Sequence, residues 1–225
     1  MTEIIVVVGT ITLFFLLTKL YQRFPYPLMI PLVTTTLLSI VILLLFDIPY
    51  PTYMAGGEWL QKMLGPAVVA LAYPLYNQRD IIMKYKISIL SGIVIAMVTG
   101  LVTVFMLLKW IGVSESWMLT AIPKSLTTPV GMQVSETIGG IPPLTAVFVM
   151  IAGFVGAIIG PFVIKYGKIE SAVSRGVSVG SASHGVGLVK LKDYGEQELS
   201  VGSLSMGLTA IIGAFLCPLF VYLLL

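Results

Sequence analysis

The chain has 225 residues, of which 57% are hydrophobic and only 10% are charged, and its mean hydropathy is +1.02. Soluble domains carry about a quarter charged residues, so this composition excludes a soluble globular domain and indicates a polytopic membrane protein. The net charge is only +3 and no basic run occurs, which argues against a nucleic-acid partner. We therefore predict an all-α, multi-pass protein of the lipid bilayer that forms one integral membrane domain over residues 1–225.

Seven apolar runs predict helices that span a bilayer. The first run covers residues 4–22; Glu3 precedes it, and Lys19 and Arg23 close it, which is the reverse of a secretory signal peptide. We predict that this first helix, within residues 1–24, is retained. The other runs lie at 27–46, 60–78, 86–109, 141–164, 171–189 and 199–225.

The segment 117–138 begins apolar but turns polar through PKSLTTPVGMQVSE, so it either crosses the membrane or dips in and returns to the same side. Basic residues gather in the cytoplasmic loops of membrane proteins. If the N-terminus lies outside and 117–138 is re-entrant, eight basic residues lie inside. They are Lys19, Arg23, Arg79, Lys84, Lys86, Lys165, Lys168 and Arg175. We predict this re-entrant arrangement, because a full crossing would place the basic 165–175 loop outside. The membrane is predicted to be the cytoplasmic membrane.

A faint internal repeat supports the same arrangement. Residues 26–46 resemble 141–160, and residues 65–78 correspond to 177–190 at the same offset of 112 residues. The two halves would enter the membrane from opposite sides, as inverted repeats of secondary transporters do; chance similarity is the alternative. The predicted parts are a first helix, repeat one, a re-entrant segment and repeat two, at 1–24, 25–110, 117–138 and 139–225.

In each predicted repeat the second apolar segment is interrupted. Gly65, Pro66 and Pro74 interrupt 60–78, and GSASHGVG at 180–187 interrupts the corresponding run. Proline and clustered glycine disfavour a regular helix. Irregular backbone at membrane depth is tolerated where it is buried in protein or lines a cavity. The N-termini of half-helices facing such a cavity favour an anion.

The 180–187 stretch contains the only histidine of the chain, His184, together with Ser181 and Ser183. Imidazole gains or loses a proton near neutral pH, and serine hydroxyls donate hydrogen bonds to carboxylates. These residues are therefore predicted to bind a small organic anion, with His184 as a candidate for proton coupling. The alternative is a neutral histidine packed between helices.

A second polar stretch, PKSLTTP at 123–129, places a lysine among hydroxyl groups between two prolines. An ammonium and hydroxyl donors on irregular backbone suit an oxyanion. The alternative is a lysine that extends from a surface loop to the lipid headgroups. The substrate-binding residues predicted from this stretch are Lys124, Ser125, Thr127 and Thr128.

Two further polar residues are candidates for the site. Glu136 is a second candidate for proton coupling and would pair with Lys124 or face water, and Asn77 ends the first broken segment and could reach the cavity. Zinc-protease, serine-hydrolase and P-loop motifs are absent, so we predict no enzyme and no cofactor. One histidine and one cysteine, Cys217, do not make a usual zinc site, so no metal is predicted.

Three stretches resemble signature regions of the LrgB/CidB family. They are LGPAVVALAYPLY at 64–76 and the longer regions at 123–150 and 180–211, and the similarity covers nearly the whole chain. The resemblance implies one of two roles. Bacterial members are described as antiholin-like proteins that modulate murein hydrolases beside a smaller LrgA/CidA-type holin-like partner. Other members are associated with pyruvate transport, and a plastid relative with glycolate and glycerate.

Two functional hypotheses follow from these residues and this resemblance. The first is a secondary transporter of small monocarboxylates such as pyruvate or glycolate, coupled to protons and affecting autolysis as a consequence. The second is an antiholin-like regulator of murein hydrolase activity that acts with a holin-like partner. In that case Gly153, Gly156 and Gly160 would allow close contact with another helix, although packing within the chain also explains them. A homodimer is a further expected assembly.

Overall fold

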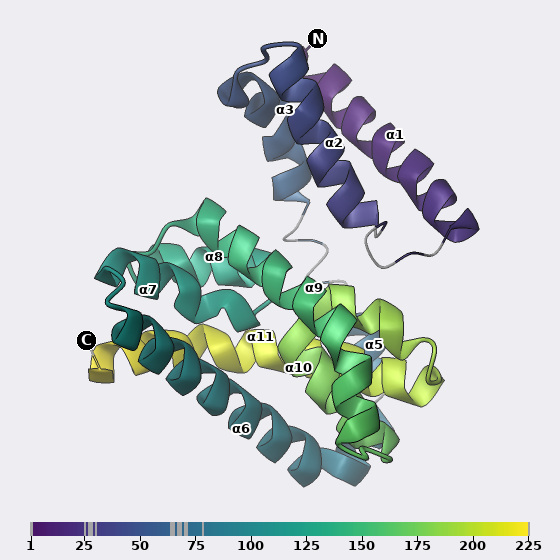
Figure 1. The fold of residues 1–225 in the computed structure, drawn as a ribbon. Coiled ribbons are helices and arrows are strands. Elements are labelled where there is room, and N and C mark those ends of the chain that lie inside the picture. The colour runs from purple at the N-terminus through teal and green to yellow at the C-terminus, as the bar shows by residue number, and fades with distance from the viewer. Residues whose placement is uncertain are drawn as a thin grey trace. The chain divides into compact units, whose positions relative to one another are not determined.

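The computed structural model describes residues 2–24, 26, 29, 31–63, 66, 69, 72–77 and 79–224. All regular structure in these ranges is helical (Figure 1), which confirms the predicted all-α class. The described chain divides into two compact units, residues 1–69 and 70–225. The boundary falls inside 60–78, the segment predicted to be broken, and Gly65 lies outside the described residues. The prediction of a single membrane domain stays a prediction.

The first unit is a small helical bundle. It contains α1 (Thr2–Arg23), α2 (Pro31–Leu45) and α3 (Tyr50–Lys62). Helices α1 and α3 pack closely because Gly56 has no side chain: a Cβ there would lie 2.7 Å from Glu3 O. The Trp59 indole N–H donates a hydrogen bond to Glu3 Oε2 at 3.2 Å, which ties the ends of the two helices together.

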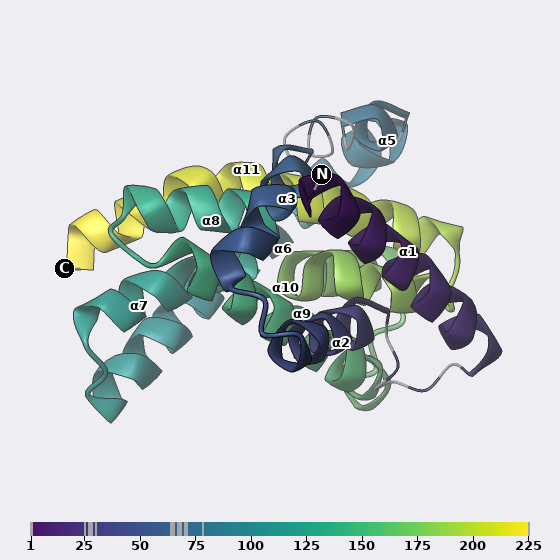
Figure 2. The ribbon, with the colours of Figure 1, turned by 90° about the horizontal axis from the view of Figure 1, so that it is seen from above.

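The second unit contains three long apolar helices and several short ones. The long helices are α6 (Arg79–Ile111), α9 (Pro142–Tyr166) and α11 (Glu196–Leu224). The others are α5 (Ala72–Asn77), α7 (Glu115–Ala121), the 3₁₀ turn η2 (Ile122–Ser125), α8 (Thr128–Thr137) and α10 (Ala172–Leu191). In Figure 2, α8 lies beside α11, and in Figure 1 α10 lies beside both α9 and α11.

Four helices of the described residues are long and apolar enough to cross a membrane: α1, α9, α11 and the Met83–Ile111 part of α6. The sequence predicts about seven spans. Helix α2 is apolar but only 15 residues long, α3 ends at Lys62 near the start of the run predicted at 60–78, and the run predicted at 171–189 is broken at His184. The all-α, multi-pass class is therefore confirmed, while the described part of the chain contains fewer long spans than the apolar runs alone predict.

Residues 115–137, here named the first hairpin, form two arms that both contact the start of α9. The Ile141 N–H donates to Thr120 Oγ1 at 3.0 Å, and Thr145 Oγ1 donates to Thr120 O at 2.8 Å. Thr145 Oγ1 also lies 2.7 Å from Ser135 Oγ, on the returning arm. Both arms thus meet at the first turn of α9, which is the shape that the predicted re-entrant segment 117–138 requires.

Residues 172–191, here named the second hairpin, double back at His184. There φ is +46° and ψ is −140°, which ends the first half of α10. A straight helix would separate residues 175 and 194 by roughly 28 Å, yet the Arg175 guanidinium lies 5.3 Å from the centre of the Tyr194 ring. The predicted break is confirmed. The segment does not cross the membrane as an interrupted helix, however, because its two halves pack side by side.

Glycines allow the second hairpin to pack directly against α9 and α11. A Cβ at Gly153 would lie 3.2 Å from Val186, and one at Gly156 would overlap the Ser183 side chain. On the other side, a Cβ at Gly180 would overlap the Gly202 carbonyl oxygen of α11. Gly153 and Gly156 therefore serve packing within the chain, which removes them from the surface offered to a partner helix.

This packing predicts opposite outcomes for two neighbouring glycines of α9. Gly156→Ala is expected to destabilise the protein by about 1–3 kcal/mol, because overpacking forces side chains and backbone to shift. Gly160→Ala is the matched control, since nothing lies within 4 Å of a Cβ at that position. Thermal unfolding in detergent measures both variants. Equal unfolding temperatures for the two variants would contradict the close packing of the second hairpin on α9.

Candidate functional site

The tips of the two hairpins meet at mid-height of the long helices. At the first tip, a Cβ at Gly100 would lie 3.7 Å from Ser125 Oγ, and a Cβ at Gly213 would overlap Leu126. Both glycines lie near the middle of their candidate spans, 83–111 in α6 and 196–224 in α11. At the second tip, Ser183 packs on Gly156, near the middle of α9. Because the hairpins start from opposite ends of α9, their tips approach each other from opposite sides.

His184 forms the tip of the second hairpin in a conformation that glycine adopts far more easily. Its φ of +46° is rare for a residue with a side chain. The chain has glycines at positions 180, 185 and 187, yet it carries an imidazole where the backbone turns. A strained residue at a buried turn is typical of functional sites. The strain therefore makes His184 a candidate functional residue.

The His184 side chain is buried without hydrogen bonds. Only 4% of the residue is exposed, and neither Nδ1 nor Nε2 has a hydrogen-bond partner. The main chain of Ser125 lies close enough to interact with the ring, although without the geometry of a full hydrogen bond, and the Lys124 ammonium lies within electrostatic range. The two polar stretches, 60 residues apart in sequence, are thus brought together, as the sequence predicts.

Lys124 is the cation of this site. It lies in η2 (Ile122–Ser125), which contains Pro123 in its first turn and is followed by Leu126 in an extended conformation (φ −114°, ψ 168°). The ammonium is half-buried and donates to Ser125 Oγ at 3.4 Å. Within the described ranges, no carboxylate forms an ion pair with it. A half-buried ammonium without a counter-charge favours an anion as its partner.

Two buried hydroxyl groups also lack hydrogen-bond partners. They are Thr127 Oγ1, at the start of α8, and Ser205 Oγ, on α11. With the two imidazole nitrogens, they are the four buried side-chain polar atoms of the described chain that have no partner. Leaving such an atom unpaired costs about 1–3 kcal/mol. Three of the four atoms belong to Thr127 and His184, at the tips of the two hairpins, which makes the tips the candidate site for a polar ligand.

The remaining predicted hydroxyls of the hairpins have different surroundings. Ser181 is buried, but its Oγ donates to Val177 O of its own helix at 2.6 Å. Ser183 is buried and faces Gly156 of α9. Thr128 is half-buried in the first turn of α8. None of the three hydroxyls is thereby shown to face Lys124 or His184, and that of Ser181 is already satisfied by its own backbone.

The structure does not bring two predicted residues into the buried cluster. Glu136 is exposed near the C-terminal end of α8, close to where the first hairpin rejoins α9. Asn77 is exposed at the end of α5. Neither position is next to Lys124 or His184 in any recorded contact of the described residues. Ser205, by contrast, was not predicted, since a serine within an apolar run carries no sign of its environment.

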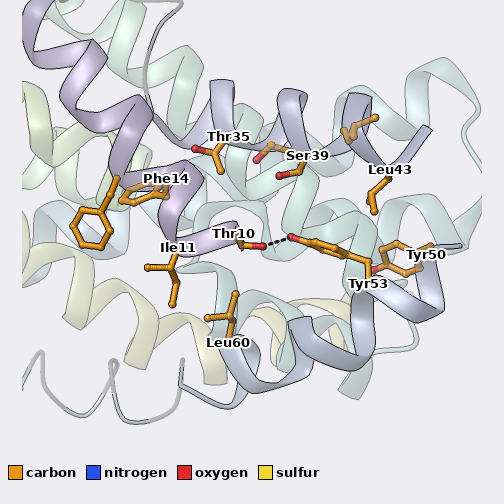
Figure 3. A pocket seen from close by; sticks show the side chains of 12 residues that line it. Thr10, Ile11, Phe14, Thr35, Ser39, Leu43, Tyr50, Tyr53 and Leu60 are labelled. Carbon is orange, nitrogen blue, oxygen red and sulfur yellow. Dashed lines mark hydrogen bonds between the residues drawn. The ribbon is translucent and has the colours of Figure 1, made fainter. Parts of the chain in front are cut away.

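A separate cavity lies within the first unit, between α1, α2 and α3 (Figure 3). Its volume is about 570 Å³, and its walls are apolar side chains with a few hydroxyls. Thr10 Oγ1 and Tyr53 OH face each other across it at 3.2 Å. None of the described side chains that line it is charged, so these walls offer no counter-charge to an anion and the hairpin tips remain the better candidate.

These features define an all-α, multi-pass membrane protein whose second unit carries two opposed hairpins. Comparison with known proteins identifies its relatives: the model of the LrgB-like family matches residues 10–223. The chain belongs to this family. No solved structure matches it significantly.

Three relatives illustrate the range of similarity. The YxaC protein of Bacillus subtilis (strain 168), which is described as uncharacterized, is 44% identical over 98% of this chain and 96% of its own length. The uncharacterized YwbG protein of the same strain is 37% identical over 89% of each chain. The holin-like protein CidB of Staphylococcus aureus (strain Mu50) is 33% identical over 98% of this chain and 96% of its own length. All three align over nearly the full chain.

Proposed function

We propose that this protein is a secondary transporter of small monocarboxylates such as pyruvate or glycolate. The observation that carries the proposal is the meeting of two opposed hairpin tips at mid-height of the long helices, one with a lysine that has no ion pair among the described residues and one with a buried histidine whose ring nitrogens are unsatisfied. Irregular backbone at this depth is typical of the substrate sites of secondary transporters.

The charges of the site favour a substrate with one negative charge. A carboxylate that leaves water needs an opposite charge and hydrogen-bond donors to replace its hydration. Lys124 supplies one positive charge, and the hydroxyls of Ser125 and Thr127 supply donors at the tip of the first hairpin. A dicarboxylate would bring a second negative charge, and the described residues of this cluster hold no second permanent cation, since His184 becomes positive only by taking up the coupled proton.

His184 is the residue that we assign to proton coupling. A carboxylate bound beside the ring would stabilise the imidazolium form, and by linkage protonation would strengthen the binding of the carboxylate. Both ring nitrogens lack partners, so either can accept the proton or donate to the substrate. Glu136 is exposed, which makes it the weaker of the two candidates.

Transport by the purified protein tests this proposal directly. The full chain is reconstituted into liposomes, and uptake of labelled pyruvate, glycolate, lactate and succinate is measured with and without a pH gradient. Uptake of the monocarboxylates, stimulated by the gradient, is expected, with little uptake of succinate. Liposomes that accumulate none of these acids above the protein-free background would refute the proposal.

The second candidate function is regulation of murein hydrolase activity together with a holin-like membrane partner. The observation that favours it is the holin-like description of CidB, which aligns with nearly the full chain. We propose that transport is the molecular activity and that an effect on autolysis follows from it. A regulator that acts only through a partner, or as a homodimer without a carrier function, would move no solute when purified alone.

We also propose that the N-terminus lies outside the cytoplasmic membrane. Because the second hairpin doubles back, Lys190 and Lys192 return to the same side as Lys165 and Lys168, which strengthens the basic character of the predicted inner side. Single cysteines at Ser114 and Glu170, exposed beyond opposite ends of α9, test this arrangement.

A membrane-impermeant thiol reagent applied to intact cells is expected to label Ser114→Cys but not Glu170→Cys. The native Cys217 is buried and gives little background. Labelling of both positions from one side would contradict the arrangement of the first hairpin and α9.

A further inference from the structure

A second cavity, lined in part by charged side chains, lies at the base of the second hairpin, at the far end of α9 from the first hairpin. Its volume is about 530 Å³, and three basic side chains line it: Lys165, Lys168 and Arg175. Glu170 is the acidic side chain in the same lining, so the described walls carry an excess of positive charge. The proposed transport function does not use these residues.

Arg175 is held in a fixed position within this cavity. Its Nε–H donates to Ile169 O at 2.7 Å, and Nη1 lies 3.5 Å from Glu198 Oε1. Its guanidinium also stacks over Tyr194 at 5.3 Å. A guanidinium has five N–H donors, so these contacts orient the group and leave further donors for a ligand.

The two lysines provide charge that the protein does not neutralise. Both are exposed, and no ion pair is recorded for either among the described residues. Lys168 adopts a positive φ of 50° in the turn after α9, a conformation uncommon for a residue with a side chain. The turn places this lysine in the lining of the same cavity as Arg175.

The remaining wall of the cavity is apolar and belongs to a candidate membrane span. Pro161, Phe162 and Ile164 line it from the last turns of α9, and Phe162 is 58% exposed. The span ends at Tyr166, and tyrosine is typical of the membrane–water interface. Cationic groups directly above an apolar wall at this depth match a phosphate followed by acyl chains.

We propose that this cavity binds the phosphate of an anionic phospholipid headgroup. Native mass spectrometry of the full chain in detergent tests the proposal with phosphatidylglycerol, phosphatidylcholine and inorganic phosphate as separate probes. The wild type is expected to retain phosphatidylglycerol in preference to phosphatidylcholine. Lys165→Gln/Lys168→Gln is expected to weaken this binding about 30-fold, since each basic residue near an anionic lipid surface contributes about 1 kcal/mol.

Two control variants separate charge from folding. Lys165→Arg/Lys168→Arg keeps the charge and is expected to retain the lipid, while Lys109→Gln removes an exposed lysine at the end of α6 and is expected to have no effect. If the protein retains inorganic phosphate but not phosphatidylglycerol, the cavity binds the phosphate of a soluble ligand. That result would overturn the lipid assignment. Equal lipid binding by the wild type and the double glutamine variant, or no preference for phosphatidylglycerol, would overturn the proposal.

Discussion

Replacing His184 with glycine is expected to leave the protein folded and at least as stable as the wild type, while transport falls by about 100-fold. Glycine adopts the φ of +46° at this position without strain, and strain of this kind costs about 1–3 kcal/mol. The substitution also removes two buried nitrogens that lack partners. A hydrogen bond to a charged group contributes about 1.5–3 kcal/mol, which accounts for the loss of transport.

His184→Ala is the matched control for this prediction. It removes the same imidazole but keeps a Cβ at the positive φ, so it is expected to unfold at a lower temperature than His184→Gly. Both variants are expected to lose uptake of labelled pyruvate in liposomes. If His184→Gly transports like the wild type, the imidazole serves only packing, and the assignment of this residue to substrate and proton coupling is wrong.

The sequence predicts the positions of the two irregular segments better than their shapes. Proline at 123 and 129 and the glycines around His184 mark where regular helix ends, because each acts on its local backbone. Whether the chain then continues across the membrane or turns back depends on contacts with α9 and α11. The packing of Ser183 on Gly156 and of Gly180 on Gly202 joins residues far apart in sequence, so no local pattern contains it.

The structure also suggests a repetition different from the predicted one. In the second unit, α6 is followed by the first hairpin, and α9 is followed by the second hairpin. Each long helix is thus joined by a short loop to a hairpin that returns to the same end. The predicted offset of 112 residues instead pairs 65–78 with 177–190, and part of the first segment lies outside the described residues. Low sequence identity cannot distinguish these pairings, whereas the path of the backbone can.

Composition explains why the site residues were only partly predictable. Lys124 and His184 stand out because charged or titratable groups are rare within apolar runs and often mark functional sites. Ser205 and Thr127 differ from many other hydroxyls only in lacking a partner. Ser181 and Thr209 donate to the carbonyl four residues earlier, as hydroxyls in membrane helices commonly do. Ser205 makes no such bond. Only the packed structure distinguishes hydroxyls that bond to their own helix from hydroxyls that lack a partner.

Replacing Lys124 with glutamine is expected to lower the apparent affinity for pyruvate by about 100-fold. Glutamine keeps hydrogen-bond donors of similar reach but removes the positive charge that faces the hairpin tips. A charge-assisted hydrogen bond is roughly twice as strong as a neutral one, and its loss costs about 1.5–3 kcal/mol. The dependence of initial uptake rate on pyruvate concentration, measured in liposomes, checks this prediction.

Two further variants decide whether the effect belongs to the site. Lys124→Arg keeps the charge and is expected to retain part of the affinity, although a planar guanidinium fits the ammonium position imperfectly. Lys109→Gln removes an exposed lysine at the end of α6 and is expected to transport like the wild type. A Lys124→Gln variant that saturates at wild-type pyruvate concentrations would mean that the anion does not bind beside this lysine. If Lys124→Gln loses affinity and Lys109→Gln does not, the result would support binding of the carboxylate between the two tips. There the unpaired groups of both hairpins can reach it.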